Sequence, residues 1–341
     1  MNDAEINAAR LLLARLGVKP EELVAAPSAT REAMPLIRDY VTRVSDAVPA
    51  GTRRVYSTYW RRVVEAWGDR RIDEPTPLEI KQLAEDVRHQ VVVRKNSRGG
   101  RTAAEHLIAS LRCLYQHAIA DELLSDNPAK RVAKPRRLAS TRRAIPDARL
   151  AEINYTAGST GSDPELDLLL LRLHTETACR RGGALALRPQ DLDPEQSLVR
   201  LREKGETVRW QPVSPTLMRH LISHHEQRGD GQPSAQLLRY RNGRPITARR
   251  YDHLWQRIGR RLPWVATQQV STHWLRHTTL TWVERNFGYA VARAYAGHDG
   301  KSDAGTTSTY VRADLQEVAA ALAALTGEPH PAVAVSCADK R

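Results

Sequence analysis

The chain has 341 residues, enough for two domains that each hold a hydrophobic core. Lys and Arg number 52 against 39 Asp and Glu, and the net charge of +13 favours a polyanionic partner, above all nucleic acid. Three widely spaced cysteines fit neither a disulfide framework nor a CxxC metal site. No apolar run reaches the length of a membrane span and no signal peptide is recognisable, so we expect a soluble, cytoplasmic protein without membrane contact.

The first part of the chain is predicted to be helical. The pattern of residues 1–29 predicts only a short helical appendage, and that of residues 30–130 predicts a compact helical domain. A stripe at helical spacing should face its core: Tyr56, Tyr59, Trp60, Val63, Val64 and Trp67. Thr76-Pro77-Leu78-Glu79 matches a capping box with proline at the first helical position.

Two basic segments are candidate DNA contacts. The first is a glycine-bearing loop between helices, whose expected phosphate contacts are Arg94, Lys95 and Arg98. The second is a basic linker over residues 131–144 that has no acidic residue and offers Lys134, Arg136 and Arg137. Each phosphate that a cation neutralises releases counterions, so a positive linker between two basic domains suits a protein that wraps DNA. A solvated loop and a solvated linker are the alternatives.

Residues 145–326 are predicted to form a second domain, mainly helical with a small sheet. A buried helix begins at Asp163, and strands at 197–201 and 208–213 form a hairpin with Lys204-Gly205-Glu206 at its tip. A last helix aligns its apolar residues on one stripe: Leu315, Val318, Leu322 and Leu325. Residues 327–341 are predicted to be a disordered tail.

Another helix of this domain is predicted to begin at Thr272, a suitable N-cap residue. His273 and Arg276 fall on one side of it, and Leu275, Thr279 and Trp282 fall on the other, where they can anchor the helix in a core. An imidazole beside a guanidinium suits a phosphodiester anion. An ordinary solvated helix face is the alternative.

The order of polar residues in this domain resembles that of the tyrosine recombinase (phage integrase) family. Residues 177–193 are similar to the family's box around its first catalytic arginine, here Arg180. His273-Trp274-Leu275-Arg276-His277-Thr278 resembles its most diagnostic motif. Ala296-Gly297-His298 resembles its Gly-His, and Thr306-Thr307-Ser308-Thr309-Tyr310-Val311 its nucleophile segment. The resemblance covers about residues 30–326.

The resemblance implies a two-domain DNA clamp, with a helical core-binding (SAM-like) domain and a catalytic recombinase domain. It implies a site-specific recombinase or integrase of a mobile element, associated with the nucleoid and acting on double-stranded DNA at specific recombination sites. Relatives work as homotetramers on DNA, some with accessory DNA-bending or directionality proteins. They exchange a C-terminal helix between protomers. Residues 315–325 could form that helix or pack within their own chain.

The implied chemistry is cleavage and rejoining through a 3′-phosphotyrosine, with a free 5′-hydroxyl and without metal, ATP or another cofactor. Tyr310 would be the nucleophile, and because a phenol of pKa about 10 attacks weakly at pH 7, His273 would act as its base. Arg180 and Arg276 would bind the non-bridging oxygens. Lys204 would protonate the leaving oxygen, and His298 would contact the phosphate and help position Tyr310.

Two features depart from the family pattern. Gly183 stands where an acidic residue is usual, so we expect Arg180 to be braced by another residue, with Glu176 and Asp191 as candidates. The interval from His298 to Tyr310 is also longer than usual. Two alternative functions stay open, a type IB topoisomerase-like nicking enzyme and a catalytically silent DNA-binding protein.

Overall fold

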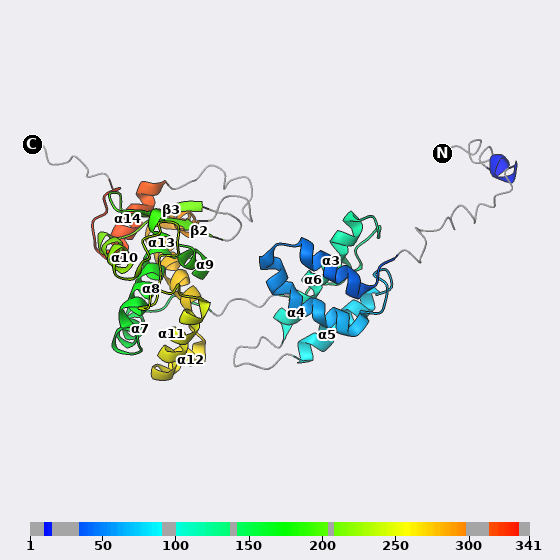
Figure 1. The fold of residues 1–341 in the computed structure, drawn as a ribbon, viewed down its shortest axis with the longest axis horizontal. Helices are drawn as coiled ribbons and strands as arrows, with labels where there is room; N and C mark the ends of the chain where they lie inside the picture. The colour runs from blue at the N-terminus through cyan, green and yellow to red at the C-terminus, as the bar shows by residue number, and fades with distance from the viewer. Residues whose placement is uncertain are drawn as a thin grey trace, which may run out of the picture. The chain divides into compact units, whose positions relative to one another are not determined.

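The computed structural model describes residues 10–15, 34–90, 100–136, 142–203, 208–297 and 314–333 (Figure 1). The chain divides into two compact units, Met1–Ala139 and Ser140–Arg341. Helices dominate the described residues of both, and the second also holds a three-stranded sheet. The predicted fold class, mainly α with a small β-sheet, is therefore confirmed.

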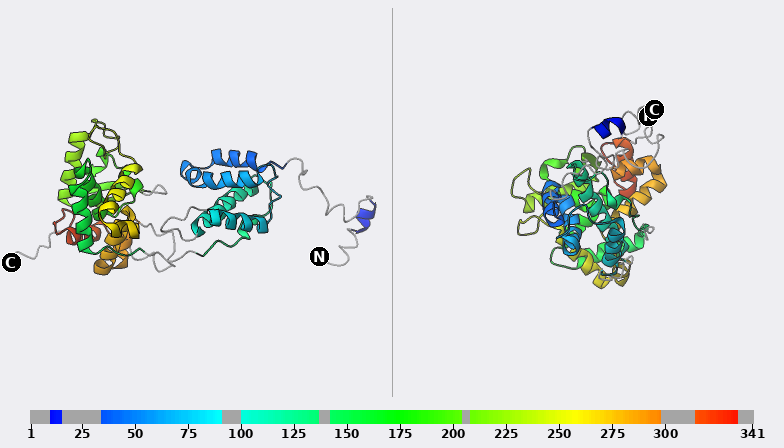
Figure 2. Two further views of the ribbon diagram at one scale, coloured as in Figure 1. Left: turned by 90° about the horizontal axis from the view of Figure 1, so that it is seen from below. Right: turned by 90° about the vertical axis from the view of Figure 1, so that its right-hand side faces the viewer.

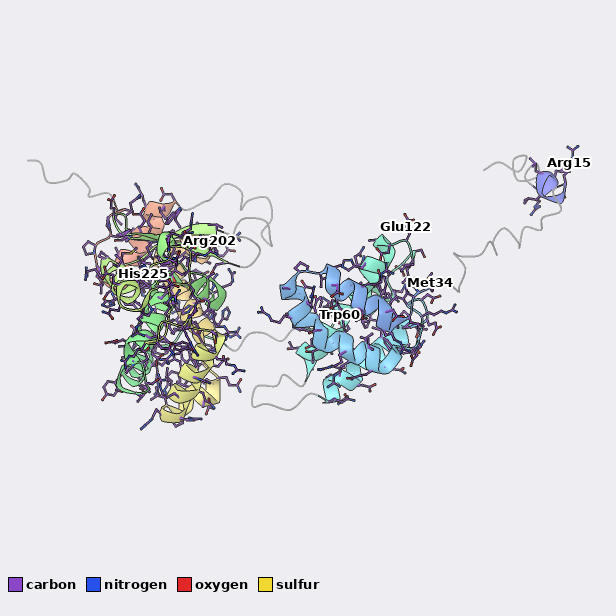
Figure 3. All side chains as sticks on the ribbon, in the orientation of Figure 1. Arg15, Met34, Trp60, Glu122, Arg202 and His225 are labelled. Carbon is purple, nitrogen blue, oxygen red and sulfur yellow. The ribbon has the colours of Figure 1, made fainter. Side chains whose placement is uncertain are left out.

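The first unit is built from α3 (Ile37–Ala47), α4 (Ala50–Trp67), α5 (Pro77–Gln90), α6 (Arg101–Ala120) and the short 3-10 helix η2 (Pro128–Lys130). The predicted stripe on α4 faces its core, since Trp60, Val63 and Trp67 are buried there. Trp60, labelled in Figure 3, donates its indole N–H to the carbonyl of Ser110 on α6 at 3.1 Å. The ring therefore fills the core while its polar atom is satisfied.

The predicted capping box begins α5. The amide of Glu79 donates to Thr76 Oγ1 at 3.3 Å, and the amide of Thr76 donates to Glu79 Oε2 at 2.8 Å. The Arg70 guanidinium donates to the other oxygen of Glu79 at 2.7 Å. The two backbone amides at this helix start are thus paired, and the loop from α4 is tied to the same carboxylate.

A buried asparagine, Asn127, joins the last short helix of the first unit to α6. Asn127 accepts from the Ala129 amide at 3.1 Å, which caps η2, and donates to the carbonyl of Arg112 on α6 at 3.0 Å. The Arg112 guanidinium in turn donates to the carbonyls of Ala129 at 3.0 Å and Val132 at 2.8 Å. These bonds hold the chain against α6 up to the start of the basic linker.

The second unit begins with α7 (Asp147–Ser159), α8 (Pro164–Thr177), α9 (Arg181–Leu185) and the 3-10 helix η3 (Pro189–Asp191). Strands β1 (Leu192–Asp193), β2 (Leu198–Arg202) and β3 (Val208–Pro212) follow. The remaining helices are α10 (Pro215–Arg228), α11 (Ala248–Arg261), α12 (Pro263–Gln268), α13 (Thr272–Ala296) and α14 (Leu315–Thr326).

The sheet is antiparallel in the order β1-β2-β3. In the β2–β3 hairpin, Arg200 lies opposite Trp210 and Arg202 opposite Val208, so the two predicted strands pair as expected. Residues 204–207 at the tip lie outside the described residues. The short edge strand β1 had no counterpart in the sequence analysis, because two residues are too few to show an alternating pattern.

Helix α8 organises the second unit, since α7, α10, α13 and α14 all pack against it (Figure 1 and Figure 2). Asp163 caps it by accepting from the Leu166 amide at 3.4 Å, and Pro164 occupies its first position. Its leucines Leu166, Leu170 and Leu173 have no exposed surface. The predicted buried helix is therefore the central helix of this unit, and the candidate site residue Arg180 follows its C-terminal end.

Helix α13 carries the His273–Arg276 pair. It begins at Thr272 with Ser271 as the flanking residue, and the Thr272 hydroxyl accepts from the Trp255 indole at 2.8 Å. The predicted N-cap role of Thr272 is thus wrong, because its side chain pairs with α11 rather than with its own helix. Gly288 interrupts the helix with a φ of 82° that few other residues adopt.

The last described segment runs from α14 to residue 333. Val318 and Leu322 of the predicted stripe are buried, and α14 packs in its own chain against α8, α13 and β3. Beyond it, Glu328 accepts from the Thr216 amide at 3.1 Å, and a His330 ring nitrogen lies 3.1 Å from the carbonyl oxygen of Ser197. These ordered contacts differ from the disordered tail predicted to start at residue 327; residues 334–341 lie outside the described residues.

Candidate active site

The site begins at the sharp turn after α8. Ala178 ends that helix in the left-handed conformation, with a φ of 49°, and is fully buried. A left-handed conformation is strained for a residue with a side chain, and such strain gathers at functional sites. The turn sends Cys179 and Arg180 away from the helix axis and leaves the carbonyl of Ala178 available to another residue.

Arg276 is the residue that pairs with this carbonyl. Its guanidinium donates to the carbonyl of Ala178 and, at 2.7 Å, to the carbonyl of Ala296 at the end of α13. The residue is only 4% exposed, so it does not lie on the open helix face that the sequence pattern predicted. Burial and the nearby charge of Arg180 lower the pKa of Arg276 to about 10, which still leaves it protonated at pH 7.

Arg180 is held by Glu203, a residue that the sequence analysis did not single out. The guanidinium donates to Glu203 Oε2 at 2.7 Å, and the Arg180 amide donates to Glu203 Oε1 at 2.7 Å. The Glu203 side chain has no exposed surface, whereas that of Arg180 is 39% exposed. The buried carboxylate thus fixes the orientation of the arginine, while part of the guanidinium is accessible to a ligand.

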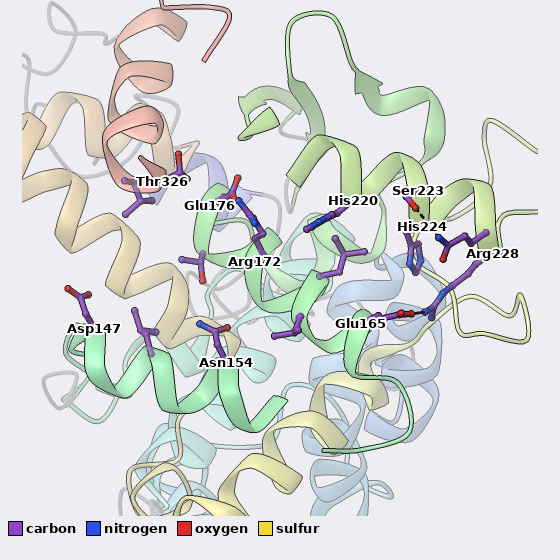
Figure 4. Close-up of a pocket in the computed structure, with 16 residues that line it drawn as sticks. Asp147, Asn154, Glu165, Arg172, Glu176, His220, Ser223, His224, Arg228 and Thr326 are labelled. Carbon is purple, nitrogen blue, oxygen red and sulfur yellow. Dashed lines mark hydrogen bonds and ion pairs between the residues drawn. The ribbon is translucent and has the colours of Figure 1, made fainter. Parts of the chain in front are cut away.

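The two braces expected from the sequence are wrong, because both carboxylates have other partners. Glu176 accepts from Arg172 Nε at 2.6 Å and from the Ser214 amide at 2.8 Å. Figure 4 shows Glu176 beside Arg172 among residues of α7, α8, α10 and α14. These residues line a cavity of about 760 Å³. Asp191 accepts from Arg200 at 3.0 Å and also pairs with Arg202.

Arg209 on β3 adds a third guanidinium that sequence reasoning missed. Its side chain is 11% exposed, and its Nε lies 3.9 Å from Glu203 Oε2. It also donates to the carbonyl of Thr177 at 3.4 Å. Burial lowers the pKa of Arg209, and the carboxylate of Glu203 opposes that shift. Its place between two solvent-facing residues of β3, Val208 and Trp210, is the signal that could have identified it.

Arg209 also packs against the glycine that ends α13. A Cβ at Gly297 would lie 2.4 Å from Arg209 Nε, so no larger residue fits there without moving the arginine. Gly297 has a φ of 64°, which further favours glycine. The glycine of the Gly-His motif therefore has a packing role as well as a conformational one.

His273 lies one helical turn before Arg276 and is exposed to solvent. It lines a cavity of about 560 Å³ together with Arg180, Thr272 and Tyr251. Partial burial of the ring and the positive charges of Arg142 and Arg276 lower the pKa of His273. The imidazole is therefore neutral at pH 7 and able to accept a proton.

A buried histidine supports the turn between α8 and α9 that carries Arg180. His174 Nδ1 lies 3.1 Å from the carbonyl oxygen of Cys179, and Nε2 lies 3.0 Å from the Tyr251 hydroxyl. Burial lowers its pKa to about 4, which keeps the ring neutral and makes it a structural rather than an acid–base residue. Burial likewise raises the pKa of the Cys179 thiol to about 11.

Several predicted site residues lie outside the described residues: Lys204, His298, Tyr310, Arg94, Lys95, Arg98 and Arg137. Of the remaining predicted DNA contacts, Lys134 and Arg136 are exposed after η2. The structure therefore brings together Arg180, His273 and Arg276, three of the six predicted catalytic residues. Among the described residues, no helix is long and apolar enough to cross a bilayer, and no three acidic, His or Cys side chains gather at a common metal position.

A sequence model of the phage integrase family matches residues 147–317, half of the chain. The chain belongs to the phage integrase family of tyrosine recombinases. Its similarity to tyrosine recombinase XerC of Chlamydia caviae is 22% identity over 296 residues, 82% of this chain and 93% of that protein. XerC of Chlamydia pneumoniae is 25% identical over 227 residues, 65% of this chain and 70% of that protein.

Solved structures of this family share the fold. A lambda integrase tetramer bound to a Holliday junction superposes with a TM-score of 0.60 at 14% identity, covering 90% of this chain and 91% of that one. The Tn1549 transposon integrase in complex with circular intermediate DNA gives a TM-score of 0.60 at 16% identity, covering 80% and 97%. The prediction of a tyrosine-type recombinase, made from the resemblance of these motifs to the family, is thus confirmed at the level of family and fold.

Proposed function

We propose that this tyrosine recombinase cleaves and rejoins double-stranded DNA at specific sites through a 3′-phosphotyrosine intermediate at Tyr310. The observation that carries the proposal is the placement of two guanidiniums, Arg180 and Arg276, at the end of α8. The first is held by a buried carboxylate at 2.7 Å, and the second by the carbonyls of Ala178 and Ala296. Two fixed cationic forks beside a neutral imidazole suit a phosphodiester whose negative charge grows during attack.

The reaction balances without an external energy source. The phenolic oxygen of Tyr310 forms a bond to phosphorus, and the bond from phosphorus to the 5′-oxygen breaks. The phenolic proton passes to a base, and the leaving 5′-oxygen takes a proton from an acid. One phosphoester bond forms for each that breaks, so the reverse attack by a 5′-hydroxyl rejoins the strand and releases the tyrosine.

The residues divide this work by their chemistry. Arg180 and Arg276 bind the non-bridging oxygens, where hydrogen bonds that strengthen in the transition state lower the barrier. His273, whose pKa is lowered, accepts the proton of Tyr310. Lys204 protonates the leaving 5′-oxygen, and His298 contacts the phosphate and helps position Tyr310.

We assign the partner and the assembly by the same reasoning. Exposed Lys134 and Arg136 contact the DNA backbone, together with Arg94, Lys95, Arg98 and Arg137. Strand exchange needs two DNA sites and two cleaved strands on each, so we propose a homotetramer on DNA, as in the lambda integrase structure. Accessory DNA-bending or directionality proteins and a cytoplasmic, nucleoid-associated location complete the proposal.

A suicide DNA substrate tests the proposal. A nick near the cleavage position lets the short 5′-hydroxyl strand diffuse away, so the covalent intermediate accumulates and migrates slowly on a denaturing gel. We expect the adduct with the wild-type chain and its loss in Tyr310→Phe, whereas Tyr289→Phe, at an exposed tyrosine of α13, keeps it. No adduct on a verified site would instead favour a silent DNA-binding protein. Plasmid relaxation without recombinant products would favour a topoisomerase-like enzyme.

A further inference from the structure

Gly183 is unusual because its backbone does not need a glycine. It lies inside the short helix α9 and is not among the residues with positive φ. A glycine inside a helix costs about 1 kcal/mol relative to alanine. Gly183 is also buried, whereas its neighbour Gly182 is exposed. Backbone conformation therefore does not account for the glycine at position 183.

The side chain of Glu203 occupies the space beside Gly183. A Cβ built on Gly183 would lie 3.2 Å from Glu203 Cγ, 3.4 Å from the Arg202 carbonyl oxygen and 3.5 Å from Glu203 Oε1. A Cβ on Gly182 would meet no atom within 4 Å. A side chain at position 183 and the side chain of Glu203 would thus point into the same volume, next to Arg180.

Glu203 accepts the hydrogen bond that an acidic residue at position 183 would accept in a capping box. Arg180 is the N-cap residue of α9, which makes Gly183 its third helical position. In a capping box, an acidic side chain at that position accepts from the N-cap amide. Here Glu203 Oε1 accepts from the Arg180 amide at 2.7 Å, and Oε2 accepts from the guanidinium at 2.7 Å. The acid comes from the end of β2 instead of from the helix.

We propose that Glu203 is the residue that positions Arg180 for phosphate binding, and that Gly183 is a glycine because it admits this carboxylate. The proposal rests on the proposed function, since it assigns Arg180 to the scissile phosphate. It has a consequence for the hairpin as well. Glu203 directly precedes Lys204 in the sequence, so the bond to Arg180 holds the last described residue before the proposed general acid.

The test moves the carboxylate from one position to the other. Glu203→Gln keeps the shape but removes the charge, and Gly183→Glu adds a second carboxylate to an occupied volume. We expect each to slow adduct formation on suicide DNA at saturating enzyme. For Glu203→Gln we expect a loss on the order of 10–100-fold, by analogy with the removal of a residue that orients a metal ligand. The double variant Gly183→Glu/Glu203→Gly should recover much of the rate, because the acid then accepts from Arg180 from within α9. Gly182→Glu, at the exposed neighbour, should retain the wild-type rate.

The outcomes distinguish this proposal from the proposed function. Recovery in the double variant, with DNA binding of all variants unchanged in a Tyr310→Phe background, supports the proposal, because a merely structural defect would not be repaired by relocating a charge. A wild-type rate in Glu203→Gln overturns it. If the single variants fail to fold, a folded but inactive double variant also overturns it. Absence of an adduct from the wild-type chain would instead overturn the proposed function.

Discussion

Arg276 donates a hydrogen bond to the carbonyl of Ala178, ninety-eight residues earlier in the chain. Ala178 adopts its left-handed conformation at the end of α8, and Arg276 reaches it from the second turn of α13. The same guanidinium bonds the carbonyl of Ala296 at the far end of α13. The Arg276 side chain therefore links the turn before Arg180 to the residue before Gly297. It has a structural role as well as its proposed role as a phosphate ligand.

This double role gives a first prediction for Arg276→Lys. A lysine has a single ammonium and cannot reproduce a planar fork that bonds two carbonyls. We expect the free energy of unfolding of the second unit to fall by about 1–3 kcal/mol, because a buried carbonyl loses its partner. The rate of adduct formation should also fall, under conditions where the Arg276→Lys variant is still folded. Arg285→Lys, at an exposed arginine of the same helix, should change neither. Unchanged adduct formation in Arg276→Lys would remove Arg276 from the phosphate site.

The lowered pKa of His273 predicts how cleavage depends on pH. The imidazole accepts a proton only while neutral, and burial together with the nearby arginine charges lowers its pKa, which favours the neutral form at pH 7. Single-turnover adduct formation should therefore change little at neutral pH and decline as the pH falls through the lowered pKa of His273. His273→Gln should be slower throughout and lack that acidic limb. An acidic limb of the same shape in His273→Gln would assign the titration to another group.

The buried neutral ring of His174 predicts a loss of stability in acid. Its pKa is about 4 in the folded protein and about 6.5 when unfolded, so the unfolded chain takes up the proton first. The stabilisation is complete above pH 6.5 and is lost as the pH falls towards 4, at up to about 1.4 kcal/mol per pH unit. Denaturant unfolding of His174→Gln should show a shallower pH dependence than the wild type. His253→Gln, at an exposed position on α11, should match the wild type.

The two units have separate cores, which predicts that damage to one leaves the other folded. Trp60 is 1% exposed, and Trp60→Ala should cost the first unit about 3–5 kcal/mol. Calorimetry should then show one transition shifted down and the transition of the second unit unchanged. Val55→Ala, at an exposed residue of the same helix, is the control. A shift of both transitions together would mean that the units fold as one.

Periodicity predicted the helices and the hairpin because burial on one face leaves a regular trace in the sequence. The stripe around Trp60 on α4 and the leucine-rich α8 are examples. The positions of charged residues were harder to predict. Arg276 falls on the polar side of a helical projection, yet it is 4% exposed because the carbonyls of Ala178 and Ala296 offer it partners. Burial of a charge depends on partners from distant segments, which a local pattern does not contain.

The brace of Arg180 shows the same limit. The glycine at position 183 revealed that an acid was missing from its expected place, but candidates chosen by nearness in sequence, Glu176 and Asp191, both pair with other arginines. Glu203 lies twenty-three residues from Arg180 and reaches it only because β2 runs beside α9. The order of motifs was sufficient to predict the family, whereas the contacts between motifs required the fold.

The most direct test of the proposed function is the chemistry of the covalent link. The adduct on suicide DNA should be digested with protease and nuclease, and the modified peptide analysed by mass spectrometry. We predict that the nucleotide is attached through its 3′-phosphate to Tyr310, and that the released strand has a 5′-hydroxyl that a kinase can label directly. Attachment at another residue, or a released strand whose 5′-end is blocked by phosphate, would contradict the account.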